Sequence, residues 1–440
     1  MNDLQELLRR NVESAPPDHL DLAGVMDAGR RRVRRRRGAV GSAALAAAGV
    51  VAVAALGWPG TDGSGVSTTD APPKPDAPTI SLADATRAVE GRDYEVLALY
   101  TNKNLMRDNG QYLDGVTDDG MILLRDGPRA DQAEARYALM DPATGAKDWL
   151  PDLHAGASQT WPIELGSEEL TLLGDDGDGF PLAYFFDRDG GRWSGMKWPE
   201  LPAVDVWRSV LGPDDRLYVF QPATQGRVPE GGWPTGPDGE ADDADAEGDT
   251  YHLWSASLDD MHDVRDEGMT VGSLAFTDSS MIWTDSTNGD AGLVHVRDLA
   301  TGEEHSFDPH TGERCNLLSF GATDDRIVMG QYCGTYSGNT RDDRVQVLST
   351  DGEQVATLQD NGVDGWLPTG SDVVNVTVFQ GGGDGGTYVY DLATDRLLQV
   401  SDTISSYALG GRLGNPGQFQ WHTPVDGAKG ATQHIGTLLP

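Results

Sequence analysis

Short apolar runs separated by tight polar turns recur along most of the chain, from Tyr94 onward. One phrase repeats six times: an apolar strand that ends near an aspartate, a tight turn, and a second strand. Asp, Thr and Gly suit such turns because an Asp side chain bonds the neighbouring backbone N–H, while Gly accepts positive φ. The six copies are Tyr137–Leu150, Leu182–Met196, Tyr251–Val264, Leu293–Phe307, Val345–Leu358 and Tyr388–Val400.

Two further short strands precede these copies, as in Gly272–Phe276 followed by Met281–Asp285. Four strands per unit at a period of roughly 45 residues predict an all-β fold, a β-propeller. A lone unit would expose two apolar faces, and ring closure buries each face against a neighbouring blade. We expect about seven four-stranded blades, with six or eight as alternatives and β-sandwich hairpins as the competing architecture.

The terminal unit is split between the two ends of the repeat region. Three of its strands are expected at Ser405–Gly411, Gln418–Pro424 and Ala431–Leu439, and Tyr94–Tyr100 supplies the fourth. A blade that joins the first and last strands removes a free sheet edge.

One copy of the turn reads Tyr388-Val-Tyr390-Asp391-Leu-Ala-Thr394. Through turns of this kind, the domain expected at 93–440 resembles the TolB-like and WD-repeat-like propellers of bacterial envelope proteins. The resemblance implies a scaffold whose loops bind proteins or small ligands, and it specifies the fold far better than any function.

The pattern changes at the N-terminal end of the chain. An Arg-rich tail, 1–37, precedes an uncharged Ala- and Gly-rich stretch, 38–58, that is long enough as a helix to span about 30 Å. We predict a transmembrane helix there, with cleavage at Ala52-Val53-Ala54 as the alternative. The tail resembles the short cytoplasmic tails of actinobacterial single-pass membrane proteins. Its topology-determining arginines are Arg30, Arg31, Arg32, Arg34, Arg35, Arg36 and Arg37.

These arginines place the tail in the cytoplasm by the positive-inside rule, and the C-terminal domain outside it. Residues 59–92 begin with a Pro-, Gly-, Ser- and Thr-rich stretch typical of an extended stalk, in which Ile80–Glu90 adds one or two helical turns. Within the propeller, Ala223–Asp249 is polar and rich in Pro and Gly, which predicts a mobile inserted loop.

Charge narrows the choice of partners. The chain carries 70 Asp and Glu against 33 Lys and Arg, a formal net charge of -37, although the tail is mildly positive. A domain this acidic repels phosphate backbones, so no nucleic-acid partner is expected. We expect the bilayer as one partner, through 38–58, and a protein, glycan or small ligand on the propeller loops as the other.

The two cysteines, Cys315 and Cys333, flank one expected hairpin whose turn lies midway between them. They should therefore face each other across adjacent strands, and we predict a disulfide; two free buried thiols are the alternative.

Other candidate chemistry is weaker. Asp141–Leu150 matches the Trp-docking phrase of quinone-type propellers, but the other copies depart from it, so we assign no cofactor. The acidic runs Gly174–Gly179 and Asp238–Asp249 lack calcium-loop spacing, and His305 and His310 lack metal spacing. We therefore assign no catalytic or metal-binding residues.

The sequence favours a binding module over an enzyme. The leading hypothesis is a membrane-anchored, extracytoplasmic propeller that binds a ligand or protein. The alternatives are a propeller enzyme acting on envelope glycans and a transmembrane sensor that signals through the N-terminal tail.

Overall fold

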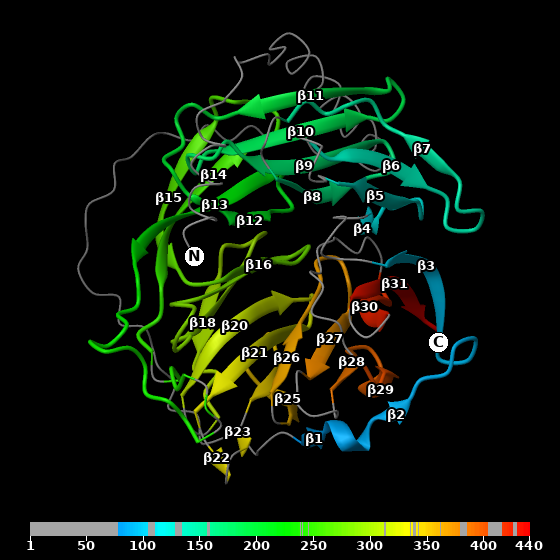
Figure 1. Ribbon diagram of the computed structural model, residues 1–440. Coiled ribbons are helices and arrows are strands. Elements are labelled where there is room, and N and C mark those ends of the chain that lie inside the picture. Colours follow the sequence, from blue (N-terminus) through cyan, green and yellow to red (C-terminus); the bar gives the residue numbers. More distant parts are fainter. Residues whose placement is uncertain are drawn as a thin grey trace, which may run out of the picture.

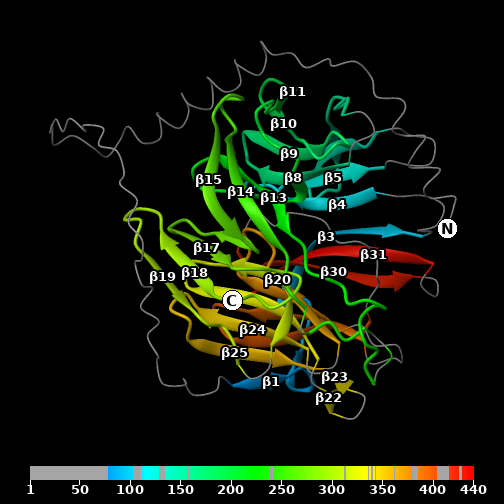
Figure 2. The same cartoon turned by 90° about the vertical axis from the view of Figure 1, so that its left-hand side faces the viewer.

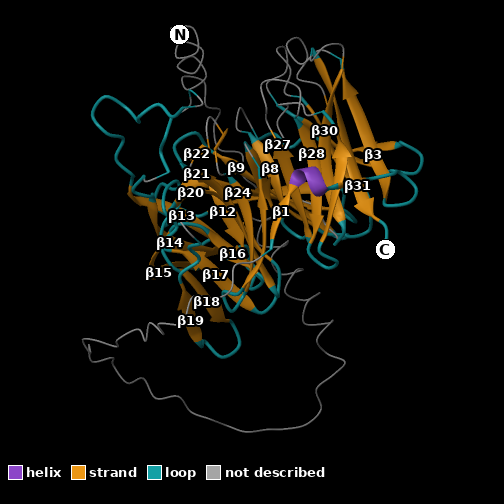
Figure 3. Cartoon of the chain, turned by 90° about the horizontal axis from the view of Figure 1, so that it is seen from below, coloured by secondary structure: helices purple, strands orange, loops and turns teal. Residues whose placement is uncertain are grey.

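The computed structural model describes residues 78–440, apart from 104–110, 128–133, 156–158, 238, 240, 245, 312–313, 335, 338–339, 342, 361, 379–384, 404–415 and 426–428. Seven sheets of three to five strands surround a common axis, as Figure 1 shows. The chain is therefore an all-β, seven-bladed propeller, as the repeat predicts. In the described part of the chain, Figure 3 shows strands and loops with a single short helical turn.

In the first six blades, the four strands of each blade follow chain order from the axis outward, and neighbours pair antiparallel. The first blade consists of β4 (Gln111–Val116), β5 (Ile122–Asp126), β6 (Arg136–Met140) and β7 (Lys147–Trp149). The second consists of β8 (Thr160–Leu165), β9 (Glu169–Asp175), β10 (Pro181–Asp187) and β11 (Arg192–Lys197). The third consists of β12 (Asp205–Leu211), β13 (Arg216–Thr224), β14 (Thr250–Ser257) and β15 (Val264–Val271). The fourth blade consists of β16 (Leu274–Phe276), β17 (Ser280–Thr284), β18 (Val294–Asp298) and β19 (Glu304–Phe307). The fifth consists of β20 (Cys315–Ala322), β21 (Arg326–Cys333), β24 (Arg344–Ser349) and β25 (Gln354–Gln359). The sixth consists of β26 (Val363–Trp366), β27 (Val373–Val378), β28 (Gly386–Asp391) and β29 (Arg396–Ser401). A small hairpin, β22 (Tyr336–Ser337) and β23 (Thr340–Arg341), extends from the fifth blade.

The repeated turns join the two outer strands of each of these six blades. Asp298 Oδ1 accepts hydrogen bonds from the backbone N–H of Ala300 and Thr301, and Gly302 follows with φ of 73°. In the sixth blade Asp395 stands where the other copy has Gly, and it adopts the same left-handed conformation, with φ of 54°. The turn geometry is thus kept even where the residue changes.

The seventh blade closes the ring. β3 (Tyr94–Asn102) pairs antiparallel with β31 (Gly430–Leu438), which pairs with β30 (Gln418–Val425), so the first and last strands share a blade as predicted. The buried Gln433 amide also bonds both the N–H and the carbonyl of Leu113 in the first blade, each at 2.8 Å. The expected strand Ser405–Gly411 lies outside the described residues.

A segment that the sequence did not place in the propeller runs outside it; we call residues 79–87 the N-terminal belt. β1 (Thr79–Ser81) pairs parallel with β25, and β2 (Thr86–Arg87) pairs parallel with β29. Figure 2 shows β1 beside β25. The helical turns expected in Ile80–Glu90 reduce to one 3₁₀ turn, Leu82–Asp84, because flanking residues join sheet edges.

The core lies between successive blades. One apolar cluster joins Phe185 of β10 to Val219 of β13, and another joins Val389 of β28 to Phe419 of β30. Each sheet thus buries both faces against its neighbours, which is the burial that ring closure was expected to provide.

The predicted anchor at 38–58, the tail with its arginines and most of the stalk lie outside the described residues. Across 78–440, with the gaps given above, no helix has the length and apolar character required to span a bilayer.

Candidate ligand site at the propeller axis

Six innermost strands, β4, β8, β12, β16, β20 and β26, surround the axis in the described part of the ring. From β4 to β26, each contacts the next one around the ring. Side chains that these strands expose therefore lie close to the axis, because the outer edge of each strand is paired with the next strand of its blade.

Bulges interrupt four of these strands, β4, β8, β12 and β20, and in β12 and β20 they leave apolar side chains uncovered. In β12, Asp205 lies opposite Phe220 and Val210 lies opposite Tyr218, so residues 206–209 leave the ladder. Bulges of this kind re-aim side chains. Trp207, within this bulge, is 58% exposed, and Leu318, in the bulge of β20, is 50% exposed.

Trp207 does not extend freely into solvent. Its ring stacks on Trp161 of β8, with 4.1 Å between ring centroids and an interplanar angle of 17°. Trp161 in turn packs against the apolar cluster between the second and third blades. One face of Trp207 is therefore fixed, and its remaining surface is available at the axis. We call Trp161 and Trp207 the axial tryptophan pair.

The innermost strands carry mainly negative charge. Their carboxylates are Asp114, Glu164, Asp205 and Asp364, against a single basic side chain, Arg208, in the described innermost strands. Burial raises the pKa of Asp364 above its ordinary value.

Two of these carboxylates are neutralised within the protein. Asp114 is buried and pairs with Arg125 at 2.6 Å. Burial raises the pKa of Asp114, although the guanidinium opposes this shift. Asp205 pairs with Arg208 at 3.2 Å. The axis thus combines an exposed aromatic surface with an excess of carboxylates.

The insertion Ala223–Asp249 was predicted to be a mobile loop, but its described residues pack across two other blades. Asp249 bridges Thr287 in the fourth blade, and Asp243 accepts a hydrogen bond from the Asn316 amide in the fifth. Ala244 and Ala246 are buried. The polar composition suggested mobility, whereas small Ala and Gly residues allow close packing here.

The predicted disulfide is confirmed. Cys315 and Cys333 lie directly opposite each other at the end of the β20–β21 hairpin, with an S–S distance of 2.10 Å. Both are buried. The next pair along the ladder, Asn316 and Tyr332, holds the insertion through bonds to Asp243 and the Ala241 carbonyl. The disulfide therefore braces the platform on which the insertion packs.

The remaining sequence candidates have structural roles. Asp175 and Asp176 accept backbone N–H bonds within their own turn, and Asp176 also pairs with Lys197. His310 bonds Asp290 at 2.7 Å. Trp149 lies beneath the Arg136 guanidinium at 4.4 Å and remains 37% exposed. Among the described residues, no group of three or more His, Cys, Asp or Glu has an arrangement that suits a metal ion.

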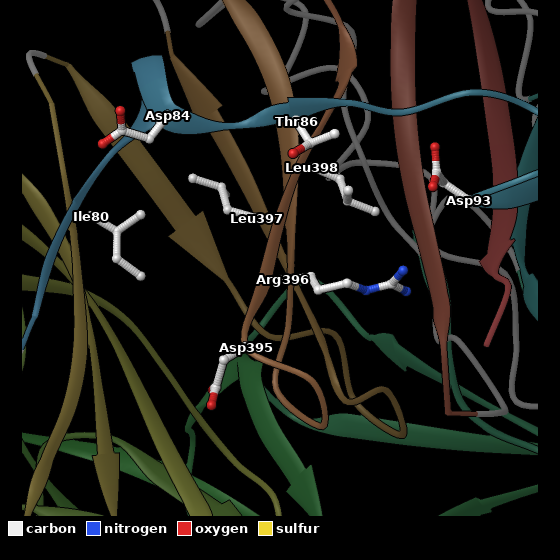
Figure 4. Close-up of a pocket in the computed structure, with 8 residues that line it drawn as sticks. All are labelled: Ile80, Asp84, Thr86, Asp93, Asp395, Arg396, Leu397 and Leu398. Carbon is white, nitrogen blue, oxygen red and sulfur yellow. The ribbon is translucent and has the colours of Figure 1, made fainter.

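A cavity of about 340 Å³ lies on the outer rim, between the N-terminal belt and β29 (Figure 4). Ile80, Leu397 and Leu398 supply apolar lining, and Arg396 donates to the Leu439 carbonyl at 3.1 Å. Because Arg396 joins β29 of the sixth blade to the residue that follows β31 of the closing blade, we interpret this cavity as part of ring closure.

Sequence reasoning missed the axial tryptophan pair. The available signal was a tryptophan near the start of the first strand in two consecutive units, TWPIEL and DVWRSVL. Nothing in this pattern distinguishes a tryptophan that packs between blades from one that a bulge turns to the axis.

Comparisons with known proteins find similarity among solved structures only. No family model and no curated protein matches the chain. Solved propellers do: the β-propeller domain of the Trilobed protease from Pyrococcus furiosus is 9% identical, with a TM-score of 0.42, over 66% of this chain and 83% of that one. An oligogalacturonate lyase in complex with manganese is 11% identical, with a TM-score of 0.47, over 80% of this chain and 99% of the lyase chain. The Cps50 (Swd1) β-propeller domain of Myceliophteria thermophila is 10% identical, with a TM-score of 0.41, over 76% of this chain and 99% of that domain's chain.

Proposed function

We propose that this chain is a membrane-anchored, extracytoplasmic propeller that binds a ligand at its axis through the axial tryptophan pair. One observation carries the proposal: Trp207 is 58% exposed on an innermost strand while stacked on Trp161. Rigid, partly exposed tryptophans on concave surfaces supply large contact area at low entropic cost.

The fold supports binding because a rigid ring of sheets can hold contact residues in a defined position. β12 departs from regular pairing at the residues that carry the site, as expected where a scaffold has been modified for contact. Asp114 and Asp205, two carboxylates of the innermost strands, are occupied by Arg125 and Arg208. Because these two carboxylates are held in ion pairs, they favour ligand recognition at the axis over a role as general acid or base.

Location is the second part of the proposal. The Arg-rich tail 1–37 stays in the cytoplasm, 38–58 spans the bilayer, and the acidic propeller lies outside. The buried disulfide supports this placement, since disulfides persist in oxidising compartments.

The experiment is equilibrium binding by the purified full-length chain in detergent. A panel of neutral oligosaccharides, cationic peptides and acidic peptides is titrated while tryptophan fluorescence is recorded. We expect a ligand whose binding weakens in Trp207→Leu. Trp149→Leu is the matched control, because Trp149 is also exposed but lies on the outermost strand β7. Equal affinity of every bound ligand for both variants would contradict an axial site.

A further inference from the structure

Cation–aromatic contacts recur in this protein. Six aromatic rings in the described residues lie beneath an Arg or Lys side chain at 4.1 to 6.0 Å from the ring centroid. These rings are Tyr112, Trp149, Tyr100, Phe180, Tyr251 and Trp283.

Trp207 is not among these rings, although a cation is adjacent in the chain. Arg208 extends to Tyr251, 5.0 Å from that ring's centroid, and pairs with Asp205 at 3.2 Å. Trp207 instead has one face on Trp161 and leaves 58% of its surface exposed. An aromatic face with this geometry is attractive to an incoming cation.

The charge around the axis favours the same ligand. Arg208 is the one basic side chain of the described innermost strands, and it is already neutralised by Asp205. Glu164 is a further carboxylate on β8 of the adjacent second blade, and Asp364 lies on β26 of the sixth blade. The whole chain has a net charge of -37, so its long-range field attracts cations and repels anions.

We infer that the axial tryptophan pair receives an arginine or lysine side chain from a basic segment of a partner polypeptide. This inference rests on the proposed axial site and names the chemistry of its ligand. A cation over a tryptophan face contributes only about a two- to thirty-fold gain in affinity. A single free amine would therefore bind weakly, whereas a segment with several basic residues also engages the surrounding carboxylates.

The test titrates the full-length protein in detergent with four probes: an octa-arginine peptide, free arginine, an octa-glutamate peptide and neutral cellohexaose. We expect octa-arginine to bind tightest, free arginine weakly, and the other two not at all. Trp207→Leu should weaken octa-arginine binding about ten-fold, and Trp207→Phe, which keeps a smaller ring, less. Trp149→Leu should bind like the wild type. Circular dichroism and thermal unfolding confirm that each variant is folded.

Salt separates the local contact from the general field. Raising the salt concentration should weaken octa-arginine binding to every variant, while the ratio between wild type and Trp207→Leu persists. Equal binding of octa-arginine to wild type and Trp207→Leu would overturn the inference. Trp207-dependent binding of cellohexaose instead would overturn the cationic ligand but leave the axial site standing. If no probe depends on Trp207, both the inference and the proposed axial site fail for these ligand classes.

Discussion

Replacing both cysteines with alanine should destabilise the propeller and loosen a segment that does not contain them. The bond joins residues 18 positions apart. Closing a loop of that size lowers the entropy of the unfolded chain and stabilises the folded state by about 3 kcal/mol. At a urea m-value of about 3 kcal/mol/M, the unfolding midpoint of Cys315→Ala/Cys333→Ala should fall by about 1 M.

The insertion should respond as well, because it packs on residues adjacent to the cysteines. Asn316 and Tyr332 bond Asp243 and the Ala241 carbonyl, and they occupy the ladder position next to the disulfide. Loss of the bond lets this end of the hairpin separate more easily. Hydrogen–deuterium exchange of peptides from 223–249 should therefore become faster than in the wild type.

Reductant supplies the control. Dithiothreitol under partly denaturing conditions should move the wild-type midpoint to that of the double variant, and should leave the variant unchanged. Identical midpoints for wild type and variant without reductant would refute the loop-closure argument. A lower midpoint with unchanged exchange in 223–249 would refute the claim that the disulfide braces the insertion.

Three further predictions follow from the belt, two buried histidines and the proposed topology. Leu82→Ala removes the buried side chain with which the N-terminal belt packs against the cluster between the fifth and sixth blades, and it should cost about 2–3 kcal/mol in urea unfolding. Asp84→Ala, on the same turn but exposed, is the control and should cost less than about 0.5 kcal/mol. Burial lowers the pKa of His422 and of His434 to about 4, so the unfolded chain binds protons that the folded chain does not between pH 6.5 and about 4. His422→Gln should therefore lose less stability than the wild type as pH falls through this window, and an unchanged pH slope would contradict the assignment. Protease added to intact cells should digest residues 59–440 and spare the tail, whereas protection of the propeller would reverse the proposed orientation.

The sequence predicted the outer part of each blade well. All six repeated phrases form outer strand pairs, and Tyr94–Tyr100 closes the last blade. These predictions succeed because turn chemistry and strand alternation are local, so a short stretch of sequence contains the information. The cysteine pairing succeeded for the same reason: residues equidistant from a turn must face each other.

The belt and the insertion were less predictable because their structures depend on distant surfaces. Thr86 and Arg87 are exposed and show no apolar alternation, yet they pair with Leu398 and Gln399 more than three hundred residues later. The insertion likewise derives its order from blades that follow it in the chain. Nothing local distinguishes these segments from a solvated loop.

The axial tryptophan pair lies where the repeat is least regular. The outer strands repeat one phrase because every blade needs the same turn, whereas four of the six described innermost strands bulge, and two of these bulges carry the exposed apolar residues Trp207 and Leu318. A bulge disrupts part of a ladder, and an exposed tryptophan gives up the free energy of burial, so both features reduce stability. Features that reduce stability at one place in a regular scaffold indicate a role in contact rather than in folding. On this reasoning, Trp207→Leu should leave the urea midpoint unchanged or slightly higher, while weakening ligand binding. A fall in midpoint comparable to that of the disulfide variant would mean that the pair serves the fold, and the site would have to be sought elsewhere.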